Sequence, residues 1–255
     1  MKILAIGDVV GSASIDYLAR KLGAYRAANG VDLICVNGEN ATQGHGIVRS
    51  DADALFRAGA DVITTGNHVW KWREIREYMD EVPTIIRPAN YPDACPGSGC
   101  VIVDAAGART LVMNVSGLVY MDTLSDPFDA VEKMLRDNAG RYDLAVLDVH
   151  AEATSEKAAI ARAFDGRIAC VWGTHTHVQT NDARILPRGT GFITDLGMTG
   201  PVDSILGIDC GVIINKFRTR MPVKFTVPAG EISASGALFT LDRSFRAVSV
   251  EAVTL

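Results

Sequence analysis

The sequence predicts an α/β protein with a mostly parallel sheet, and two observations support this. In the first half of the chain, short apolar segments of strand length alternate with segments whose apolar residues recur at helical spacing. Each apolar segment also ends at polar or glycine residues, as buried strands do before a turn. This alternation is typical of βαβ units, in which a helix carries the chain back so that the next strand runs parallel.

The first half is expected to contain three such units. Strands are expected at residues 2–6, 33–36 and 62–65. Helices are expected at about residues 15–28, 50–58 and 71–79. Residues 84–115 change to short β segments interrupted by proline and glycine, which predict hairpins or sheet edges.

The second half continues this alternation and then becomes less regular. Helices are expected at residues 126–138 and 155–164, the second capped by Thr154 or Ser155. Strands are expected at residues 144–149, 168–172 and 192–194, followed by closing antiparallel strands at 224–227, 237–241 and 247–250. Residues 195–209 are glycine-rich and are expected to form an ordered loop near the functional site. Because no linker or internal repeat is present, we expect one domain over residues 1–255.

Composition and charge limit the function classes. The 255 residues carry a net charge of −5 and are 48% hydrophobic, which is ordinary for a globular protein with a large core. The absence of a basic block or stripe argues against a dedicated DNA or RNA binder, although a small nucleotide could still bind. No apolar segment approaches membrane-spanning length, and the apolar run before Asp8 is too short for a signal peptide.

The five cysteines predict reduced thiols in a cytoplasmic protein. Their number is odd, and no two have the Cys-x-x-Cys spacing of metal or redox motifs. Cys35 and Cys170 lie inside apolar runs, so we expect them to pack as small hydrophobic residues.

Two of the five histidines lie in one pentapeptide, Gly-Thr-His-Thr-His at residues 173–177. His175 and His177 follow an apolar run that ends at Trp172, so they stand at the end of an expected strand. Imidazole nitrogen is a common ligand of zinc, iron and similar cations. On its own, however, the pair could be two surface histidines in a loop.

Other expected strands also end in groups that can bind a cation. Ligands of parallel sheets gather beyond the carboxyl ends of the strands, so these groups are expected to lie together. Taken singly, Asp8 could be a helix cap, Asn67 a turn residue, Glu39 a solvated loop charge and His150 a core histidine. Coincidence at successive strand ends is much less expected than any one of these alternatives. The candidate ligands are Asp8, Glu39, Asn40, Asn67, His150, His175 and His177, with His68 beside Asn67.

This mixture of carboxylates, carboxamides and imidazoles favours borderline transition metals over calcium or magnesium, which prefer oxygen ligands. The groups are too many for one ion and about enough for two, and Glu39 is the obvious anionic bridge. A pair of cations clamps a phosphate, lowers the pKa of a bound water and directs it in line at phosphorus. The residues therefore predict a two-metal site for phosphoester hydrolysis.

At these motifs the sequence resembles a known family. Gly-Asp at residues 7–8, Gly-Asn-His at 66–68, His150 and His-x-His at 175–177 resemble the calcineurin-like dinuclear metallophosphoesterases. More closely, the chain is similar to the YmdB-type bacterial phosphodiesterases at residues 7–11, 37–40, 150–157, 173–180 and 194–201. The resemblance covers essentially the whole chain, and it implies a four-layer α/β/β/α sandwich with two packed mixed sheets.

The resemblance also implies a role for each candidate. One metal would be held by Asp8, Glu39, Asn40 and His177, and the other by Glu39, Asn67, His150 and His175. His68 would be unligated and would stabilise the transition state or protonate the leaving oxygen. Position 10 is valine where the wider family has a histidine ligand, and Glu39 replaces the usual bridging aspartate. The YmdB-type proteins share both differences, which leave iron, manganese or zinc as the metal.

The leading hypothesis is therefore a metal-dependent phosphodiesterase of cyclic nucleotides, and the resemblance favours 2′,3′-cyclic over 3′,5′-cyclic substrates and implies a homo-oligomer. The alternatives are a phosphomonoesterase or nucleotidase with the same two-metal core, and a regulatory protein that senses a phosphate group. An unligated acid such as His68 favours an enzyme over a sensor. Further residues that could approach the substrate are His45, Arg49, Trp70, Lys71, Trp72, Arg87 and Asn90.

Overall fold

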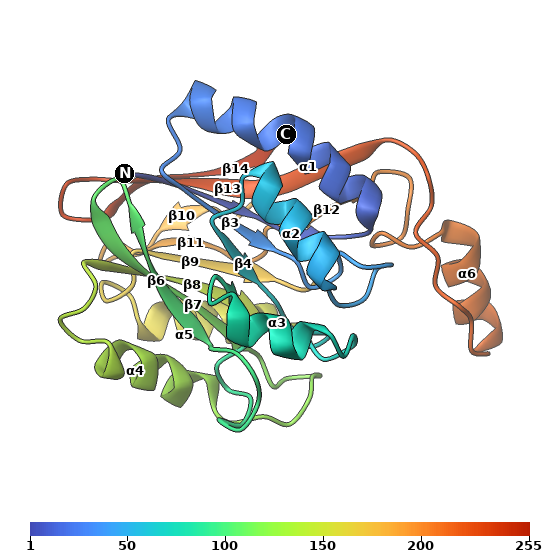
Figure 1. Cartoon of the computed structure of the whole chain (residues 1–255), viewed down its shortest axis with the longest axis horizontal. Coiled ribbons are helices and arrows are strands. Elements are labelled where there is room, and N and C mark those ends of the chain that lie inside the picture. Colours follow the sequence, from blue (N-terminus) through green and yellow to red (C-terminus); the bar gives the residue numbers. More distant parts are fainter.

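Two mixed β-sheets pack face to face, and helices cover the outer face of each. The computed structural model describes all residues, 1–255. Figure 1 shows α1 (Ser12–Asn29) and α2 (Arg49–Ala58) on one side of the paired sheets, with α4 (Pro127–Asp137) and α5 (Thr154–Ala163) on the opposite side. This is the expected four-layer α/β/β/α sandwich.

The first sheet has eight strands with a parallel centre, as its apolar runs predict. The strand order is β2 (Asp8–Val9), β12 (Met198–Pro201), β13 (Ile232–Leu241), β1 (Lys2–Ile6), β3 (Leu33–Asn37), β4 (Val62–Thr64) and β5 (Ile85–Ile86), with β14 (Ala247–Thr254) paired to β13. Strands β1, β3, β4 and β5 are parallel. Strand β13 comes from near the end of the chain, yet it pairs antiparallel with β1 and lies inside the sheet.

The second sheet has six strands. Their order is β10 (Arg184–Ile185), β11 (Gly191–Ile193), β9 (Cys170–Thr174), β8 (Leu144–His150), β7 (Ala108–Ser116) and β6 (Cys100–Ala105). Strands β7, β8, β9 and β11 are parallel, and β6 forms an antiparallel hairpin with β7. The hairpin confirms the expectation for the segment interrupted by proline and glycine.

The alternation of side chains along the strands separates three apolar layers. In β1, Ile3 and Ala5 face the second sheet, whereas Leu4 and Ile6 pack with the side chains of α1 and α2. A third cluster packs α4 and α5 against the outer face of the second sheet. Each sheet is therefore covered by apolar side chains on both faces, as expected for its nearly continuous apolar strands.

The middle layer joins the two sheets. Trp172 of β9 and Phe239 of β13 pack together there, with their ring centroids 5.9 Å apart. Cys35 and Cys170 are buried in the same layer as free thiols, which confirms their expected packing as small hydrophobic residues. The two sheets thus share one continuous core.

Helix boundaries differ in places from those expected. Helix α3 (Ile75–Glu81) begins later than residue 71, because residues 67–74 form successive turns after β4. Helix α5 already includes Thr154, and its N-cap residue, Ala153, has no side chain that could cap it. The expected capping by Thr154 or Ser155 is therefore wrong.

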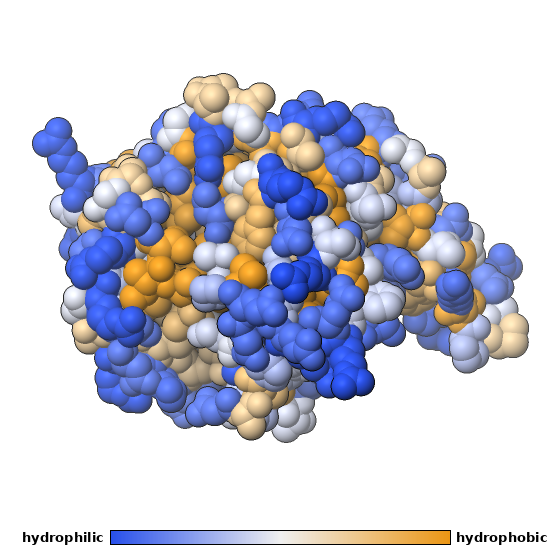
Figure 2. Space-filling model, in the orientation of Figure 1, coloured by the Kyte–Doolittle hydropathy of each residue, from blue (hydrophilic) through white to orange (hydrophobic).

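Helix α6 (Cys210–Thr219) is absent from the sequence-based expectations. The Asp209 side chain caps it by accepting a hydrogen bond from the Val212 N–H at 3.0 Å. Its glycine, valine and isoleucine residues have low helix propensity, which explains why the pattern does not predict a helix. Figure 1 shows α6 projecting from the body, and Figure 2 shows the same projection with a mixed hydrophilic and hydrophobic surface. No helix of the protein is both long and apolar enough to span a bilayer.

The expected strand at residues 224–227 is also wrong. These residues alternate in polarity, but they pair with no other strand. Pro222 and Pro228 flank the segment and lack the N–H groups that a β-ladder needs. Phe225 instead stacks on His45, with ring centroids 5.7 Å apart, so the segment crosses the surface next to the predicted site.

Candidate active site

The structure brings all seven candidate ligands together with His68 where the two sheets meet. Those from the first half of the chain follow strands of the first sheet: Asp8, Glu39, Asn40 and Asn67. Those from the second half end or follow strands of the second sheet: His150, His175 and His177. The ligand atoms of Glu39, His150 and His175 all lie within 4.8 Å of one another. Residues from both halves of the chain thus form one cluster.

Glu39 is fully buried within this cluster. Its Oε2 accepts a hydrogen bond from the His68 N–H at 3.0 Å. Its Oε1 lies 2.8 Å from His68 Nδ1 and 3.3 Å from His150 Nε2, but neither contact is aligned as a hydrogen bond. Burial raises the pKa of Glu39, but the nearby His150 and His68 outweigh burial and hold that pKa below its ordinary value. Glu39 therefore presents a charged oxygen that is free to bind a cation.

Asp8 is the second buried carboxylate with a free oxygen. Its Oδ2 accepts a hydrogen bond from the His175 N–H at 3.0 Å. Its Oδ1 has no hydrogen bond and lies 3.7 Å from His177 Nε2 and 3.9 Å from His150 Nδ1. Leaving a buried carboxylate oxygen without a partner costs free energy, and burial raises the pKa of Asp8. Cations between these oxygens and imidazoles would remove that cost, so the donor set fits a metal centre.

The two asparagines lie within reach of different histidines. Asn40 Nδ2 is 3.0 Å from His177 Nε2, and Asn40 Oδ1 is 3.2 Å from His68 Nδ1. Asn67 Oδ1 is 3.0 Å from His150 Nε2. Asn40 thus lies beside His177 and His68, and Asn67 lies beside His150.

His150 is held from behind by a buried polar network. Its Nδ1 lies 2.9 Å from Thr174 Oγ1, which in turn donates a hydrogen bond to Asp148 at 2.7 Å. Burial lowers the pKa of His150, but Glu39 and the other nearby carboxylates raise it to about 9. The carboxylates thus favour the protonated ring, and a cation that binds its nitrogen must compete with a proton.

A buried ion pair supports the turn at residues 175–177, here called the histidine turn. The sequence did not single out this pair. Lys157 Nζ donates a hydrogen bond to Asp195 Oδ2 at 2.7 Å, and both side chains are fully or almost fully buried. Asp195 also accepts hydrogen bonds from the N–H groups of Thr176 and Gly197. Both residues lie in the runs that resemble the YmdB-type proteins, but nothing in the sequence indicates that they pair across 38 positions.

The backbone at the site adopts conformations that the sequence alone does not reveal. His175 has φ 97° and His177 has φ 63°, both in the left-handed region that few non-glycine residues occupy. The hydrogen bonds from this turn to Asp8 and Asp195 hold it in place. At Gly66 a Cβ atom would lie 2.2 Å from the His150 ring, so only glycine fits there.

A pocket of about 290 Å³ opens onto the cluster. Its polar wall contains Glu39, Asn40, His68, His175 and His177, and its apolar wall contains Val10, Leu206, Ile208 and Phe225. His45 also lines it, edge-on to His68 with ring centroids 5.1 Å apart. None of the 13 lining residues is lysine or arginine. The pocket could therefore hold a phosphoester with an apolar substituent, but it offers no cationic side chain.

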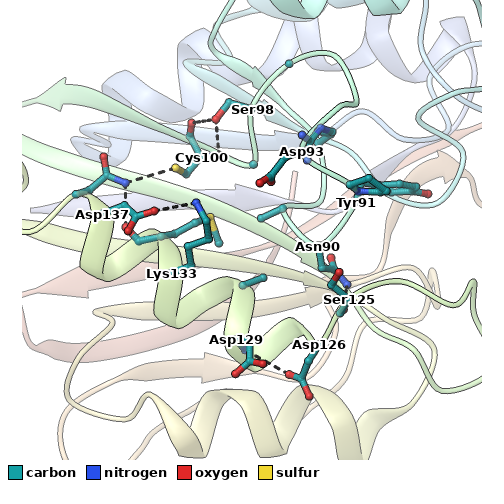
Figure 3. Close-up of a pocket in the computed structure, with 18 residues that line it drawn as sticks. Asn90, Tyr91, Asp93, Ser98, Cys100, Ser125, Asp126, Asp129, Lys133 and Asp137 are labelled. Atoms are coloured by element: carbon teal, nitrogen blue, oxygen red, sulfur yellow. Dashed lines mark hydrogen bonds and ion pairs between the residues drawn. The ribbon is translucent and has the colours of Figure 1, made fainter.

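The arginine and lysine candidates lie outside this pocket. Arg87 is buried, and its guanidinium donates hydrogen bonds to the carbonyls of Pro88, Cys95 and Pro96. It lines a separate cavity of about 550 Å³ beside α4, which contains none of the candidate ligands. Figure 3 shows that cavity, where Lys133 pairs with Asp137. Arg49 instead forms an exposed ion pair with Glu81 on the outer surface.

Two other candidates make structural contacts, and Asn90 lines the separate cavity beside α4 rather than this pocket. The Trp72 indole N–H donates a hydrogen bond to the His45 carbonyl at 2.8 Å, which fixes the glycine-rich loop. Asn90 Nδ2 donates to the Ser116 carbonyl at the end of β7. Phe225 and Glu152 are lining residues that the sequence did not single out. The contact of Phe225 with His45 depends on the fold of a segment that was expected to be a strand.

Two packed mixed sheets with carboxylate, amide and imidazole groups at their meeting edge define the calcineurin-like metallophosphoesterase class. The model of the YmdB-like protein family matches residues 4–253. The chain is 43% identical to a 2′,3′-cyclic-nucleotide 2′-phosphodiesterase of Bacillus subtilis (strain 168), over all of this chain and 97% of that protein. This chain therefore belongs to the YmdB-like family.

Solved structures agree with this assignment. The crystal structure of a protein from Thermus thermophilus superposes with a TM-score of 0.94 at 36% identity, covering all of this chain and 99% of the other. A novel phosphatase of Mycoplasma pneumoniae superposes with a TM-score of 0.93 at 30% identity, covering all of this chain and 93% of the other. The likeness extends over the whole sandwich.

Proposed function

We propose that this protein is a phosphodiesterase that hydrolyses cyclic nucleotides, with 2′,3′-cyclic preferred over 3′,5′-cyclic substrates. The observation that carries the proposal is the buried cluster of Asp8, Glu39 and the histidines beside a pocket large enough for a small phosphoester. The similarity to a 2′,3′-cyclic-nucleotide 2′-phosphodiesterase supports the choice of substrate. Ring strain supports it further, because a five-membered cyclic phosphodiester is more reactive than an unstrained one.

Two metal ions would complete the site. We propose that Asp8, Glu39, Asn40 and His177 hold one ion, and that Glu39, Asn67, His150 and His175 hold the other. When bound, such ions polarise the phosphoryl oxygens and lower the pKa of an attacking water. Nitrogen and oxygen donors together favour iron or manganese, with zinc as a further possibility.

His68 would act on the leaving group. It lies in the pocket wall with its side chain 35% exposed, and its Nδ1 is 2.8 Å from Glu39 Oε1. From this position an imidazole N–H can donate a proton to the departing sugar oxygen. Glu39 and the His68 main chain are joined by a hydrogen bond, so the acid and the metal cluster keep a fixed separation.

The charge of the pocket favours a diester over a monoester. A monoester carries an additional negative charge at neutral pH, and sites built for it commonly add Arg or Lys to hold that charge. This pocket has neither, and its positive charge would come mainly from the metals. We therefore propose that a singly charged diester is the preferred substrate.

One preparation tests both parts of the proposal. The purified protein is expected to carry close to two transition-metal ions per chain, and a chelator should abolish activity that added manganese or iron restores. The same metal-loaded sample should hydrolyse a 2′,3′-cyclic nucleotide and bis(p-nitrophenyl) phosphate with higher kcat/KM than p-nitrophenyl phosphate. Full activity without metal would contradict the two-metal site. A clear preference for the monoester would identify a phosphomonoesterase or nucleotidase instead.

The compartment and assembly are further parts of the proposal. Five free cysteines without a disulfide are consistent with a reducing cytoplasm. We also propose a homo-oligomer, because the projecting α6 exposes Ile214 and Phe217 to solvent. Apolar side chains exposed on a projection are commonly covered by a partner.

A further inference from the structure

Each of the three histidines proposed as metal ligands has a partner on its outward ring nitrogen. His150 Nδ1 faces Thr174 Oγ1 at 2.9 Å, and His177 Nδ1 lies 3.0 Å from the Leu206 carbonyl. His175 Nε2 lies 3.2 Å from Glu152 Oε2. Glu152 is thus the only one of the three outward partners that carries a formal charge.

The two nitrogens of His175 face opposite environments. Its Nδ1 lies 3.2 Å from His150 Nε2, inside the cluster that includes Glu39. Its Nε2 points toward Glu152, whose side chain is 50% exposed in the wall of the pocket. A neutral imidazole carries one proton, and only the nitrogen without that proton can bind a metal. A carboxylate at Nε2 keeps the proton there and leaves the lone pair of Nδ1 directed into the cluster.

We propose that Glu152 is a positioning residue that fixes the tautomer and ring orientation of His175 for metal binding. The proposal rests on the metal site of the proposed function and adds a residue to it. Carboxylate partners of ligating histidines also increase the basicity of the ring. The loss of Glu152 should therefore weaken the binding of the ion that His175 holds. The ion held by Asp8, Asn40 and His177 should be affected less, because Glu152 does not contact those residues.

The chain offers a matched control for the charge of Glu152. Glu132 lies on α4, is 48% exposed and pairs with Arg167 at 2.7 Å. It therefore has the same residue type, nearly the same exposure and one charged partner, but it does not line the pocket. Glu132→Gln removes the same charge from the protein without touching the cluster.

The experiment measures Mn²⁺ affinity by competition with a chelator in the parent, Glu152→Ala, Glu152→Gln and Glu132→Gln. Glu152→Ala should lower the affinity for one of the two Mn²⁺ ions by ~10–100-fold. Glu152→Gln should lower this affinity less, because the amide oxygen still accepts a hydrogen bond from His175 Nε2. Glu132→Gln should match the parent. Electron paramagnetic resonance at limiting Mn²⁺ should change from the spectrum of a coupled ion pair in the parent to that of a single ion in Glu152→Ala.

The outcomes separate this inference from the proposed function. If the parent binds two Mn²⁺ ions and Glu152→Ala binds both with parent affinity, the role of Glu152 is wrong while the metal site stands. An equal loss of both ions, with a lowered Tm, would indicate a general structural role and also overturn the proposal. A parent protein that binds no Mn²⁺ would overturn both the metal site and the role of Glu152.

Discussion

Among single residues, Glu39 and His68 are neighbours with different predicted tasks. Glu39 is buried and carries the free oxygen that would bridge two cations, whereas His68 is partly exposed in the pocket wall. A bridging anion screens two cations from each other, so removing it should reduce metal binding. A proton donor that binds no metal should affect only turnover.

Two variants test this division of roles. Glu39→Gln should lower both metal content and activity. His68→Ala should keep metal content near the parent value and lower kcat by ~10²-fold or more. Metal analysis of each purified variant, followed by steady-state kinetics with one diester, measures both quantities. If His68→Ala loses metal as readily as Glu39→Gln does, the assignment of the two roles is wrong.

The sequence indicated the candidate ligands better than the residues that hold their side chains in position. Asp8, Glu39, Asn67 and the histidines could be found because each one follows a buried strand, and the topology of a parallel sheet collects such positions. The sequence gives no comparable signal for Glu152, because its contact with His175 depends on the orientation of the His175 ring. Supports of this kind require side-chain orientations, which apolar periodicity does not encode.

At the scale of elements, the Lys157–Asp195 pair ties α5 to the segment between β11 and β12. That segment contacts the histidine turn through the Thr176 N–H. Removing one partner of a buried ion pair leaves an uncompensated charge in the core, which is strongly destabilising. An exposed pair contributes much less, because solvent screens it.

Lys157→Met should therefore lower the free energy of unfolding by ~3–5 kcal/mol. Arg167→Met removes the half-exposed pair with Glu132 and should cost about 0–1 kcal/mol. Denaturant unfolding of both variants beside the parent measures the difference. Similar losses of unfolding free energy in the two variants would show that the buried pair stabilises the protein no more than the exposed pair does.

The sequence pattern was accurate for some elements and failed for others. The runs that became β1, β3 and β8 are short, apolar and bounded by turn residues, so their positions follow from the pattern. Helix α6 was missed because its β-branched residues disfavour a helix, and Asp209 compensates as a cap. Alternating residues near Phe225 resemble a strand, but the flanking prolines prevent pairing. Both misses lie in segments where local contacts outweigh periodicity.

For the whole molecule, the shared middle layer suggests that residues 1–255 unfold as one unit. Phe239 packs on Trp172 across the two sheets and is fully buried. Phe239→Ala should cost ~3–5 kcal/mol through the cavity that it leaves. At this chain length, that loss corresponds to about 10 °C in Tm.

Calorimetry tests the proposed single domain. The parent should show one unfolding transition, and Phe239→Ala should move that transition to lower temperature without splitting it. Two resolved transitions in the parent, or a shift of only one of them in the variant, would indicate that the sheets fold as separate units.

The position of β13 within the first sheet also affects how the protein can fold during synthesis. Strand β1 is made first, yet one of its two neighbours comes from residues 232–241 and therefore leaves the ribosome almost last. Synthesis at ~5–20 residues per second leaves the nascent β1 edge without that neighbour for ~10 s or longer. The ligands of the second sheet also emerge late, so a nascent chain that carries Asp8 and Glu39 has no histidine turn to oppose them. Metal loading of this fold is therefore expected to follow translation of the chain beyond His177.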